Sequence, residues 1–389
     1  MRKICVITGS RSEYGLLAPL MREIKTDRDM ELQVIATGMH LSRDFGNTYE
    51  EIEKDGFTIS AKVDIELLSD ETRHIASSTG KAIAGFAQVY DDLKPDIVVV
   101  LGDRFEIFGA SAAACISRIP VAHINGGEIT EGAFDEAFRH SITKMSQLHF
   151  TSAEEYRKRV IQLGEDPDTV INAGALGVDN INALVLMSRE DLEESLDFKF
   201  HERNFLITFH PVTLEDDTSE EQFAFLLEAL DRRPGAGMIF TKSNADSFGR
   251  IINKMIDDYV TANSDKAVAF VSMGQVRYLS AMKFVDAVVG NSSSGIIETP
   301  NFKIPTVNIG DRQKGRIRVD SIIDCGTSVE DISKVLDKAC DPVFRKSLQG
   351  MTNPYGDGKA AARIKKILKE TGIDTTKKRF FDINFTVNK

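Results

Sequence analysis

Residues 121–140 read VAHINGGEITEGAFDEAFRH, and this stretch gives the clearest indication of the fold. It opens as a short apolar strand, turns at a pair of glycines and continues into a helix-like sequence that begins with acidic residues. In a parallel α/β sheet, ligands and reacting groups collect in the loops that follow the carboxyl ends of strands. The stretch therefore predicts a strand, a loop and a helix, with polar groups at the edge of a sheet.

Two acidic positions of this stretch are separated by the glycine-bearing loop. Glu128 follows the glycines, the pair Asp135 and Glu136 opens the helix, and His123 and His140 flank them. Carboxyl groups placed on two faces of one substrate suit general acid–base catalysis. The alternative is structural, because carboxylates in the first turn of a helix are stabilised by the helix dipole. For this stretch alone both interpretations stay open.

The length and composition of the chain limit the classes of protein it can be. With 389 residues it is long enough for two domains of roughly 150 residues each. A net charge of −11 argues against broad binding to nucleic acid or to anionic membranes. The N-terminal sequence lacks the features of a signal peptide and no window approaches a membrane span, so we expect a cytoplasmic protein. The four cysteines lack the spacing of a zinc or redox site.

Apolar runs alternate with helical patterns along the chain and restart after a glycine-rich segment near residues 171–179, which indicates a hinge or a domain boundary. The expected strands cover residues 4–8, 32–37, 61–65, 96–101, 121–124, 148–151, 205–209, 238–241, 268–272, 287–290 and 306–309. The expected helices include residues 49–54, 79–93, 105–117, 153–163, 330–338 and 360–369. Continuous Val- and Ile-rich strands joined by helices are typical of a parallel sheet covered on both faces.

The organisation predicted from this pattern is two successive doubly wound α/β domains that face a central cleft. The first domain is expected at residues 1–177 and the second at residues 178–360. A C-terminal helix and tail follow at residues 361–389, and the tail is expected either to pack back on the first domain or to fray.

Polar residues follow several expected strands and would face the same cleft. They are Arg11, Asp103, Arg104 and Glu128 in the first half, and His210, residues 291–294, Glu298 and Arg312 in the second. None of them is diagnostic alone, because surface arginines are common. Their shared position after strands is what indicates a site.

The segment GNSSSGIIE, residues 290–298, has the character of an anion-binding loop. Small hydroxyl residues and glycines between a strand and a helix leave backbone N–H groups free, and Glu298 would lie about one turn into that helix, able to accept from ribose hydroxyls. A serine-rich helix cap is the structural alternative. The chain contains neither GxGxxG nor GxxxxGK followed by Ser or Thr, and its histidines lack metal-ligand spacing.

Seven segments together resemble the hydrolysing UDP-N-acetylglucosamine 2-epimerases of bacterial sialic acid pathways. They are GSRSEYGLLAPLM, TGMHLSRDFGNTYEEI, LGDRFE, HINGGEITEGAFDEAFRH, FHPVT, GNSSSGIIE and NIGDRQKGR. The resemblance runs from about residue 3 to residue 369. It implies a GT-B fold, in which two Rossmann-like domains face a cleft and the second binds most of the nucleotide. It also implies a homodimer or homotetramer, a nucleotide-sugar substrate, and no metal or redox cofactor.

The resemblance assigns roles to individual residues. The catalytic candidates are Asp103, Glu128, Asp135, Glu136 and His210, and the choice between Asp135 and Glu136 stays open. The resemblance also gives contacts of the nucleotide diphosphate, namely Arg11, His210, Asn244, Ser292, Ser293, Glu298 and Arg312. From their positions at strand ends, Arg104, His40 and His123 are further substrate-binding candidates.

The chemistry implied by the resemblance is an elimination followed by a hydration. The sugar C2 hydrogen is not next to a carbonyl, so a base removes it as the nucleotide leaves C1, and a 2-acetamidoglucal forms. The predicted substrate is UDP-N-acetylglucosamine, with N-acetylmannosamine and UDP as products. The alternative is the same reaction on a GDP-linked 2,4-diacetamido-trideoxyhexose (bacillosamine) for legionaminic acid biosynthesis. An alternative of another class is a GT-B glycosyltransferase.

Overall fold

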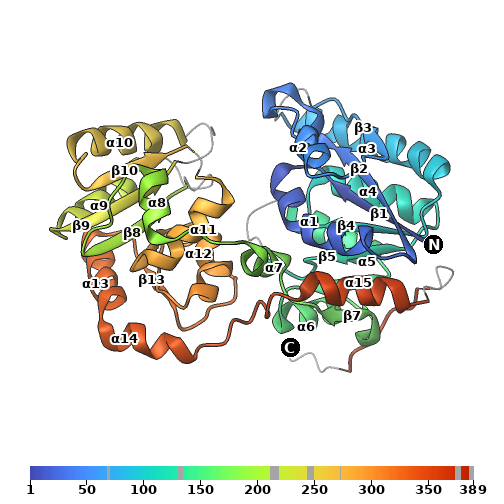
Figure 1. Ribbon diagram of the computed structural model, residues 1–389. Coiled ribbons are helices and arrows are strands. Elements are labelled where there is room, and N and C mark those ends of the chain that lie inside the picture. The colour runs from blue at the N-terminus through green and yellow to red at the C-terminus, as the bar shows by residue number, and fades with distance from the viewer. Residues whose placement is uncertain are drawn as a thin grey trace. The chain divides into compact units, whose positions relative to one another are not determined.

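The computed structural model describes residues 1–67, 71–129, 135–210, 219–242, 249–271, 273–372 and 378–384. The chain forms two compact units, residues 1–180 together with 354–389, and residues 181–353 (Figure 1). The sequence placed these divisions at 177–178 and 360–361, whereas the structure places them at 180–181 and 353–354. The first unit is discontinuous, because its last helix follows the second unit in the chain.

The first unit is built on a seven-stranded parallel sheet with the strand order β3-β2-β1-β4-β5-β6-β7. Its strands are β1 (Arg2–Thr8), β2 (Met30–Thr37), β3 (Ala61–Val63), β4 (Ile97–Leu101), β5 (Val121–Ile124), β6 (Leu148–Thr151) and β7 (Val170–Asn172). Its helices are α1 (Arg11–Lys25), α2 (Tyr49–Lys54), α3 (Thr72–Leu93), α4 (Phe105–Ile116), α5 (Asp135–Met145), α6 (Glu154–Gln162) and α15 (Ala360–Glu370), and α7 (Leu176–Ala183) crosses the boundary.

The apolar strands of this sheet are buried on both faces. In β1, Ile4 and Val6 pack into the core formed with α1 and α15, while Cys5 and Ile7 pack into the core formed with α3 and α4. Successive side chains of a strand point to opposite faces, so a strand that is covered twice has to be apolar at every position.

The second unit repeats this plan with six parallel strands in the order β10-β9-β8-β11-β12-β13. Its strands are β8 (Arg203–Thr208), β9 (Ala236–Thr241), β10 (Ala267–Phe270), β11 (Ala287–Gly290), β12 (Thr306–Ile309) and β13 (Ile322–Cys325). Its helices are α8 (Arg189–Leu196), α9 (Ser219–Asp231), α10 (Gly249–Ala262), α11 (Gly274–Phe284), α12 (Ser294–Ile297), α13 (Val329–Cys340) and α14 (Pro342–Ser347). The prediction of two doubly wound α/β domains is confirmed.

Strand order changes direction at one place in each sheet, between β1 and β4 in the first and between β8 and β11 in the second. In doubly wound sheets, ligands bind in the crevice outside the carboxyl ends of the strands at such a switch point. We therefore expect the residues of a ligand site near the carboxyl ends of the strands at these two switch points.

The helix α15 belongs to the first unit and lies beside α1 (Figure 1). Asp179 accepts hydrogen bonds from the backbone N–H groups of Ala360 at 2.9 Å and Ala361 at 2.7 Å. These contacts supply partners for N–H groups that the first turn of a helix leaves unpaired. Asp179 therefore anchors the start of α15 from a distant part of the chain. Within the described ranges, no helix is long and apolar enough to span a membrane.

Candidate active site

Two carboxylates and one backbone oxygen surround the guanidinium of Arg139 near the carboxyl ends of β4 and β5. Arg139 donates to Glu136 Oε2 at 2.6 Å, to the backbone oxygen of Glu128 at 2.9 Å, and to the carboxylate of Asp103. Its side chain is only 6% exposed. A buried cation requires opposite charges around it, so Arg139 holds these acidic positions together.

Burial changes the acidity of two carboxyl groups in this cluster. It raises the pKa of Asp103, which the charge of Arg139 opposes and the charge of Asp135 reinforces. Burial also raises the pKa of Asp135, against the charge of Arg104. A carboxyl group with a raised pKa keeps its proton closer to neutral pH, as a general acid must.

The loop after β5 presents Glu128 from a backbone that depends on glycine. Gly127 has a φ of +79°, and a Cβ atom there would lie 2.4 Å from the backbone oxygen of Tyr156. The carboxylate of Glu128 accepts a hydrogen bond from the hydroxyl of Ser152, directly after β6, at 2.9 Å. The Glu128 side chain is thus fixed between two strand ends.

A second pair of acidic residues, Glu13 and Glu106, lies at the switch point between β1 and β4. Arg104 Nε donates to Glu106 Oε1 at 2.5 Å and lies 4.0 Å from Glu13 Oε1. Glu13 in turn accepts from the backbone N–H of Gly9 at 2.7 Å. Burial, and next the charge of Glu106, raise the pKa of Glu13 to about 8. Two buried acids therefore hold the Arg104 guanidinium at this strand end.

His40 and His123, predicted to contact the substrate, both form hydrogen bonds within the first unit. Both are fully buried. His123 Nε2 donates to the backbone oxygen of Gly102 at 2.8 Å and its Nδ1 lies 3.1 Å from Thr143 Oγ1. His40 bonds through Nε2 to the hydroxyl of Thr8 and through Nδ1 to that of Thr48. Both rings therefore support the loops of the site through these hydrogen bonds.

These two histidines predict how stability depends on pH. Burial lowers the pKa of His40 to about 4 and that of His123 to about 3. Below about pH 6.5 these histidines bind protons in the unfolded chain, whereas in the folded protein they stay neutral. We expect these two histidines to lower the free energy of unfolding as the pH drops from about 6.5 to about 4, each by up to about 1.4 kcal/mol per pH unit, against the opposite contribution of Glu13. Denaturant titrations at pH 7 and pH 4.5 measure this slope. His123→Gln should make it shallower, and an unchanged slope would contradict the assignment for His123.

At the switch point of the second unit, the side chain of Asn291 joins the ends of β8 and β11. Its Oδ1 accepts from the backbone N–H of His210 at 2.7 Å, and its Nδ2 donates to the backbone oxygen of His210 at 2.7 Å. Gly290, just before it, has a φ of +134°, and a Cβ atom there would lie 1.9 Å from the backbone oxygen of Thr208. The close approach of the two strand ends therefore requires glycine at this position.

Polar side chains from two other elements lie near this junction. Arg312 and Gln313 both donate to the backbone oxygen of Asn291, at 3.0 and 2.9 Å. Glu298 accepts from the hydroxyl of Ser294, and burial raises the pKa of Glu298 against that hydrogen bond. An arginine beside a loop of small hydroxyl residues suits a phosphate group.

The remaining candidates fall in three groups. Ser292 and Ser293 are half-buried in the loop after β11. Arg11 lies at the start of α1 with a side chain 66% exposed, and pairs with Glu51 at 3.1 Å. Asn244 lies outside the described residues, as do residues 211–213 of the segment that follows His210. Among the described residues, no group of three or more His, Cys, Asp or Glu side chains is placed to hold a metal ion.

A sequence profile described as UDP-N-acetylglucosamine 2-epimerase matches residues 22–369. The chain belongs to this family. Three relatives match the chain along nearly their whole length. A Campylobacter jejuni protein named GDP/UDP-N,N'-diacetylbacillosamine 2-epimerase (hydrolyzing) is 44% identical, over 98% of this chain and 99% of its own. The polysialic acid biosynthesis protein P7 of Escherichia coli is 39% identical, with 98% of each chain covered. The UDP-N,N'-diacetylbacillosamine 2-epimerase (hydrolyzing) of Legionella pneumophila is 33% identical, over 95% and 96%.

Solved structures of the epimerase family share the fold. The UDP-N-acetylglucosamine 2-epimerase of Neisseria meningitidis, bound to UDP-N-acetylglucosamine, superposes with a TM-score of 0.75 at 20% identity, covering 95% of this chain and 100% of that one. At this identity the likeness is one of fold. It confirms the predicted GT-B class with its two Rossmann-like domains, while the central cleft stays a prediction.

Sequence reasoning did not select three residues that the epimerase places at the first site, namely Arg139, Glu13 and Glu106. Arg139 follows Glu136 by one helical turn, a spacing that puts both side chains on one face of α5 and could have indicated the pair. Glu13 and Glu106 each lie near the start of a helix that follows a strand end. Their burial depends on Arg104 and on the packing of two strands, which the sequence does not display.

Proposed function

We propose that this epimerase is a hydrolysing 2-epimerase that acts on a nucleotide-linked 2,4-diacetamido-trideoxyhexose of the bacillosamine type. The observation that carries the proposal is the 44% identity, along almost the whole of both chains, to the Campylobacter jejuni relative named for that substrate. The Legionella pneumophila relative, named for the same sugar, adds support. The motifs in the sequence favoured UDP-N-acetylglucosamine. That sugar becomes the second candidate, supported by the E. coli relative named for polysialic acid biosynthesis.

The reaction proposed is an elimination followed by addition of water. A base takes the C2 proton while the bond between C1 and the diphosphate oxygen breaks, which releases the nucleoside diphosphate and leaves a C1–C2 double bond. An acid then delivers a proton to C2 from the opposite face, and water adds its oxygen to C1. The net change consumes one water and inverts C2. It needs two carboxyl groups in opposite protonation states.

The first site offers carboxyl groups that suit these two roles. We assign the base to Glu128, whose carboxylate is held by Ser152, and the acid to Asp103, whose pKa burial raises. Arg139 bonds to the carboxylate of Asp103 and to the backbone oxygen of Glu128, so its positive charge is held beside the group to which we assign the acid role. Arg312 and the loop at residues 291–294 are assigned to the leaving diphosphate, where fixed cations and N–H groups stabilise developing charge.

The function is tested by incubating the enzyme in D2O with UDP- and GDP-linked diacetamido sugar and, separately, with UDP-N-acetylglucosamine. Proton NMR follows the free nucleotide and sugar. We expect release of nucleoside diphosphate together with a C2-deuterated 2-epimer of the diacetamido sugar. Turnover of UDP-N-acetylglucosamine alone would keep the mechanism and change the substrate.

Two other results would reject the reaction itself. Nucleotide release without deuterium at C2 would indicate simple hydrolysis of the glycosyl bond. Turnover that requires an added sugar acceptor would indicate the glycosyltransferase alternative.

A further inference from the structure

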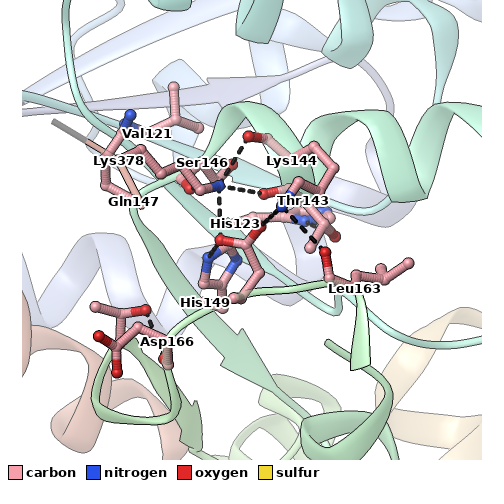
Figure 2. Close-up of polar contacts among 12 residues, drawn as sticks. Val121, His123, Thr143, Lys144, Ser146, Gln147, His149, Leu163, Asp166 and Lys378 are labelled. Carbon is pink, nitrogen blue, oxygen red and sulfur yellow. Dashed lines mark hydrogen bonds and ion pairs between the residues drawn. The ribbon is translucent and has the colours of Figure 1, made fainter. Parts of the chain in front are cut away.

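The end of α5 is capped by a lysine from the C-terminal segment of the chain. Lys378 Nζ lies 3.2 Å from the backbone oxygen of Thr143, 2.7 Å from that of Lys144 and 2.5 Å from that of Ser146 (Figure 2). The last carbonyl groups of a helix have no partner within it, and a cation there interacts favourably with the helix dipole. The Lys378 ammonium thus supplies a partner for the last carbonyl groups of α5. The first turn of the same helix carries Asp135 and Glu136.

The same ammonium is tied to a buried carboxylate. Lys378 Nζ lies 2.6 Å from Glu165 Oε2, and the Glu165 side chain is only 1% exposed. Glu165 also accepts from Lys144 Nζ at 2.6 Å and from His149 Nε2 at 2.9 Å. Burial opposes ionisation of Glu165, but the hydrogen bonds from His149, Lys144 and Lys378 outweigh it and lower the pKa to about 2. Glu165 is therefore a charged anchor inside the first unit at neutral pH.

Residues 378–384, here called the strap, make further contacts with the same region. The backbone N–H of Phe381 donates to the backbone oxygen of Gly164 at 2.9 Å. A Cβ atom on Gly164 would lie 2.3 Å from the ring of Phe380, so glycine makes room for that ring. Lys144 Nζ lies 4.8 Å from the centre of the same ring. The strap therefore holds Lys378 in place at the end of α5.

Hydrogen bonds connect this end of α5 to the loop that carries Asp103. Thr143, whose backbone oxygen faces Lys378, also places its hydroxyl 3.1 Å from His123 Nδ1. His123 Nε2 then bonds to the backbone oxygen of Gly102, directly before Asp103 (2.8 Å). The strap is thus linked to the catalytic loop through three consecutive contacts.

The helix packs into the core formed with α3 and α4 through Ile142, with Phe138 and Met145 against that core. It is 11 residues long, and its buried residues are Arg139, Ile142 and Thr143. Helices this short are marginal alone in water, so tertiary contacts decide where they lie. Phe138 stacks on Phe108 of α4 with ring centres 4.9 Å apart. Polar contacts therefore hold α5 at two points along its length, Asp103 on Arg139 and Lys378 on the last carbonyls.

We propose that Lys378 is a positioning residue of the epimerase site, acting through α5. It fixes the axial position of the helix and hence the placement of Glu136 and Arg139 against Asp103. The proposal rests on the proposed function in one respect: turnover of the nucleotide sugar is the measurement that reveals where α5 lies. A shift of a catalytic group by about 1 Å lowers turnover by roughly 100-fold, so a modest slip of α5 would be measurable.

The test compares Lys378→Met with Arg379→Met, which removes a charge from the next, exposed residue of the strap. In Lys378→Met, Glu165 keeps Lys144 and His149, so we expect the protein to fold. We expect kcat to fall by roughly 10- to 100-fold, KM for the nucleotide sugar to stay within about twofold, and one limb of the pH profile of kcat to shift. Lys378→Arg, which keeps the charge, should retain most of kcat, and Arg379→Met all of it.

Hydrogen exchange of the α5 amides separates this proposal from the proposed function. We expect faster exchange across residues 136–146 in Lys378→Met than in Arg379→Met, whether or not any of the sugars is turned over. Equal exchange in the two variants would overturn the proposal, even if the enzyme is active. A fall in melting temperature with kcat and pH profile unchanged would also overturn it, because it would leave Lys378 a purely structural role.

Discussion

Replacing Glu128 with Gln is expected to lower kcat by about 10²- to 10⁴-fold, the usual contribution of one general acid or base. Glutamine keeps the shape of the side chain, and its oxygen can still accept the hydrogen bond from Ser152. The change therefore removes the proton acceptor with little disturbance of the loop, and KM should stay close to that of the parent enzyme. Release of nucleoside diphosphate and deuterium incorporation at C2 measure the effect.

The matched control for this prediction is Glu154→Gln. Glu154 begins α6 and its side chain is 48% exposed, paired only loosely with Arg157 at 3.3 Å among the contacts described. We expect kcat of this variant to stay within about twofold of the parent, because surface charges contribute little. If Glu128→Gln incorporated deuterium at C2 at the parental rate, Glu128 would have no part in proton transfer.

Replacing Arg139 with Met is expected to produce the largest combined effect on stability and activity. Removing one partner from a buried ion pair leaves charges without compensation and costs about 3–5 kcal/mol of unfolding free energy. The carboxylates of Asp103 and Glu136 would both lose the guanidinium that now lies between them. Without that cation, the pKa of Asp103 should rise further above its ordinary value. We expect kcat to fall because Asp103 and Glu136 lose the group that holds them in place.

Arg232→Met provides the comparison for Arg139→Met. Arg232 is 44% exposed and pairs with Glu228 at 2.8 Å on the surface of the second unit. Its removal is expected to change the unfolding free energy by less than about 1 kcal/mol. Denaturant unfolding of the two variants at pH 7 measures the difference, and similar losses in both would show that Arg139 does not bind the acids of the site together.

The strands were the most predictable part of the fold, because burial on both faces leaves a local signature. The apolar runs at residues 121–124 and 148–151 coincide with β5 and β6. The beginning of α3 was placed too late, at 79 instead of Thr72, since residues 72–73 and 76–77 are exposed and show no apolar stripe. The edge strands β7 and β13 were missed, because each has one neighbour and only one buried residue, Val170 and Ile323.

The site was partly predictable for a geometric reason. Asp103, Glu128 and Glu136 were selected because they follow strand ends, and the carboxyl ends of parallel strands meet at one edge of a sheet. The roles of His123 and Arg139 were not predictable, because each depends on a partner far along the chain. His123 bonds to Thr143, 20 residues further along the chain, and Arg139 forms an ion pair with Asp103, 36 residues before it.

The discontinuous first unit has a consequence for the order in which the protein folds as it is made. Ribosomes release the N-terminus first, and domains generally fold as units. Residues 181–353 form one continuous unit, so its core can close while the chain is still growing. The first unit must wait longer, since Ala361, Ile364 and Leu368 of α15 complete its core from beyond the second unit. The half of the protein that is synthesised first is therefore finished last, with the apolar face of α1 uncovered through the translation of the other half.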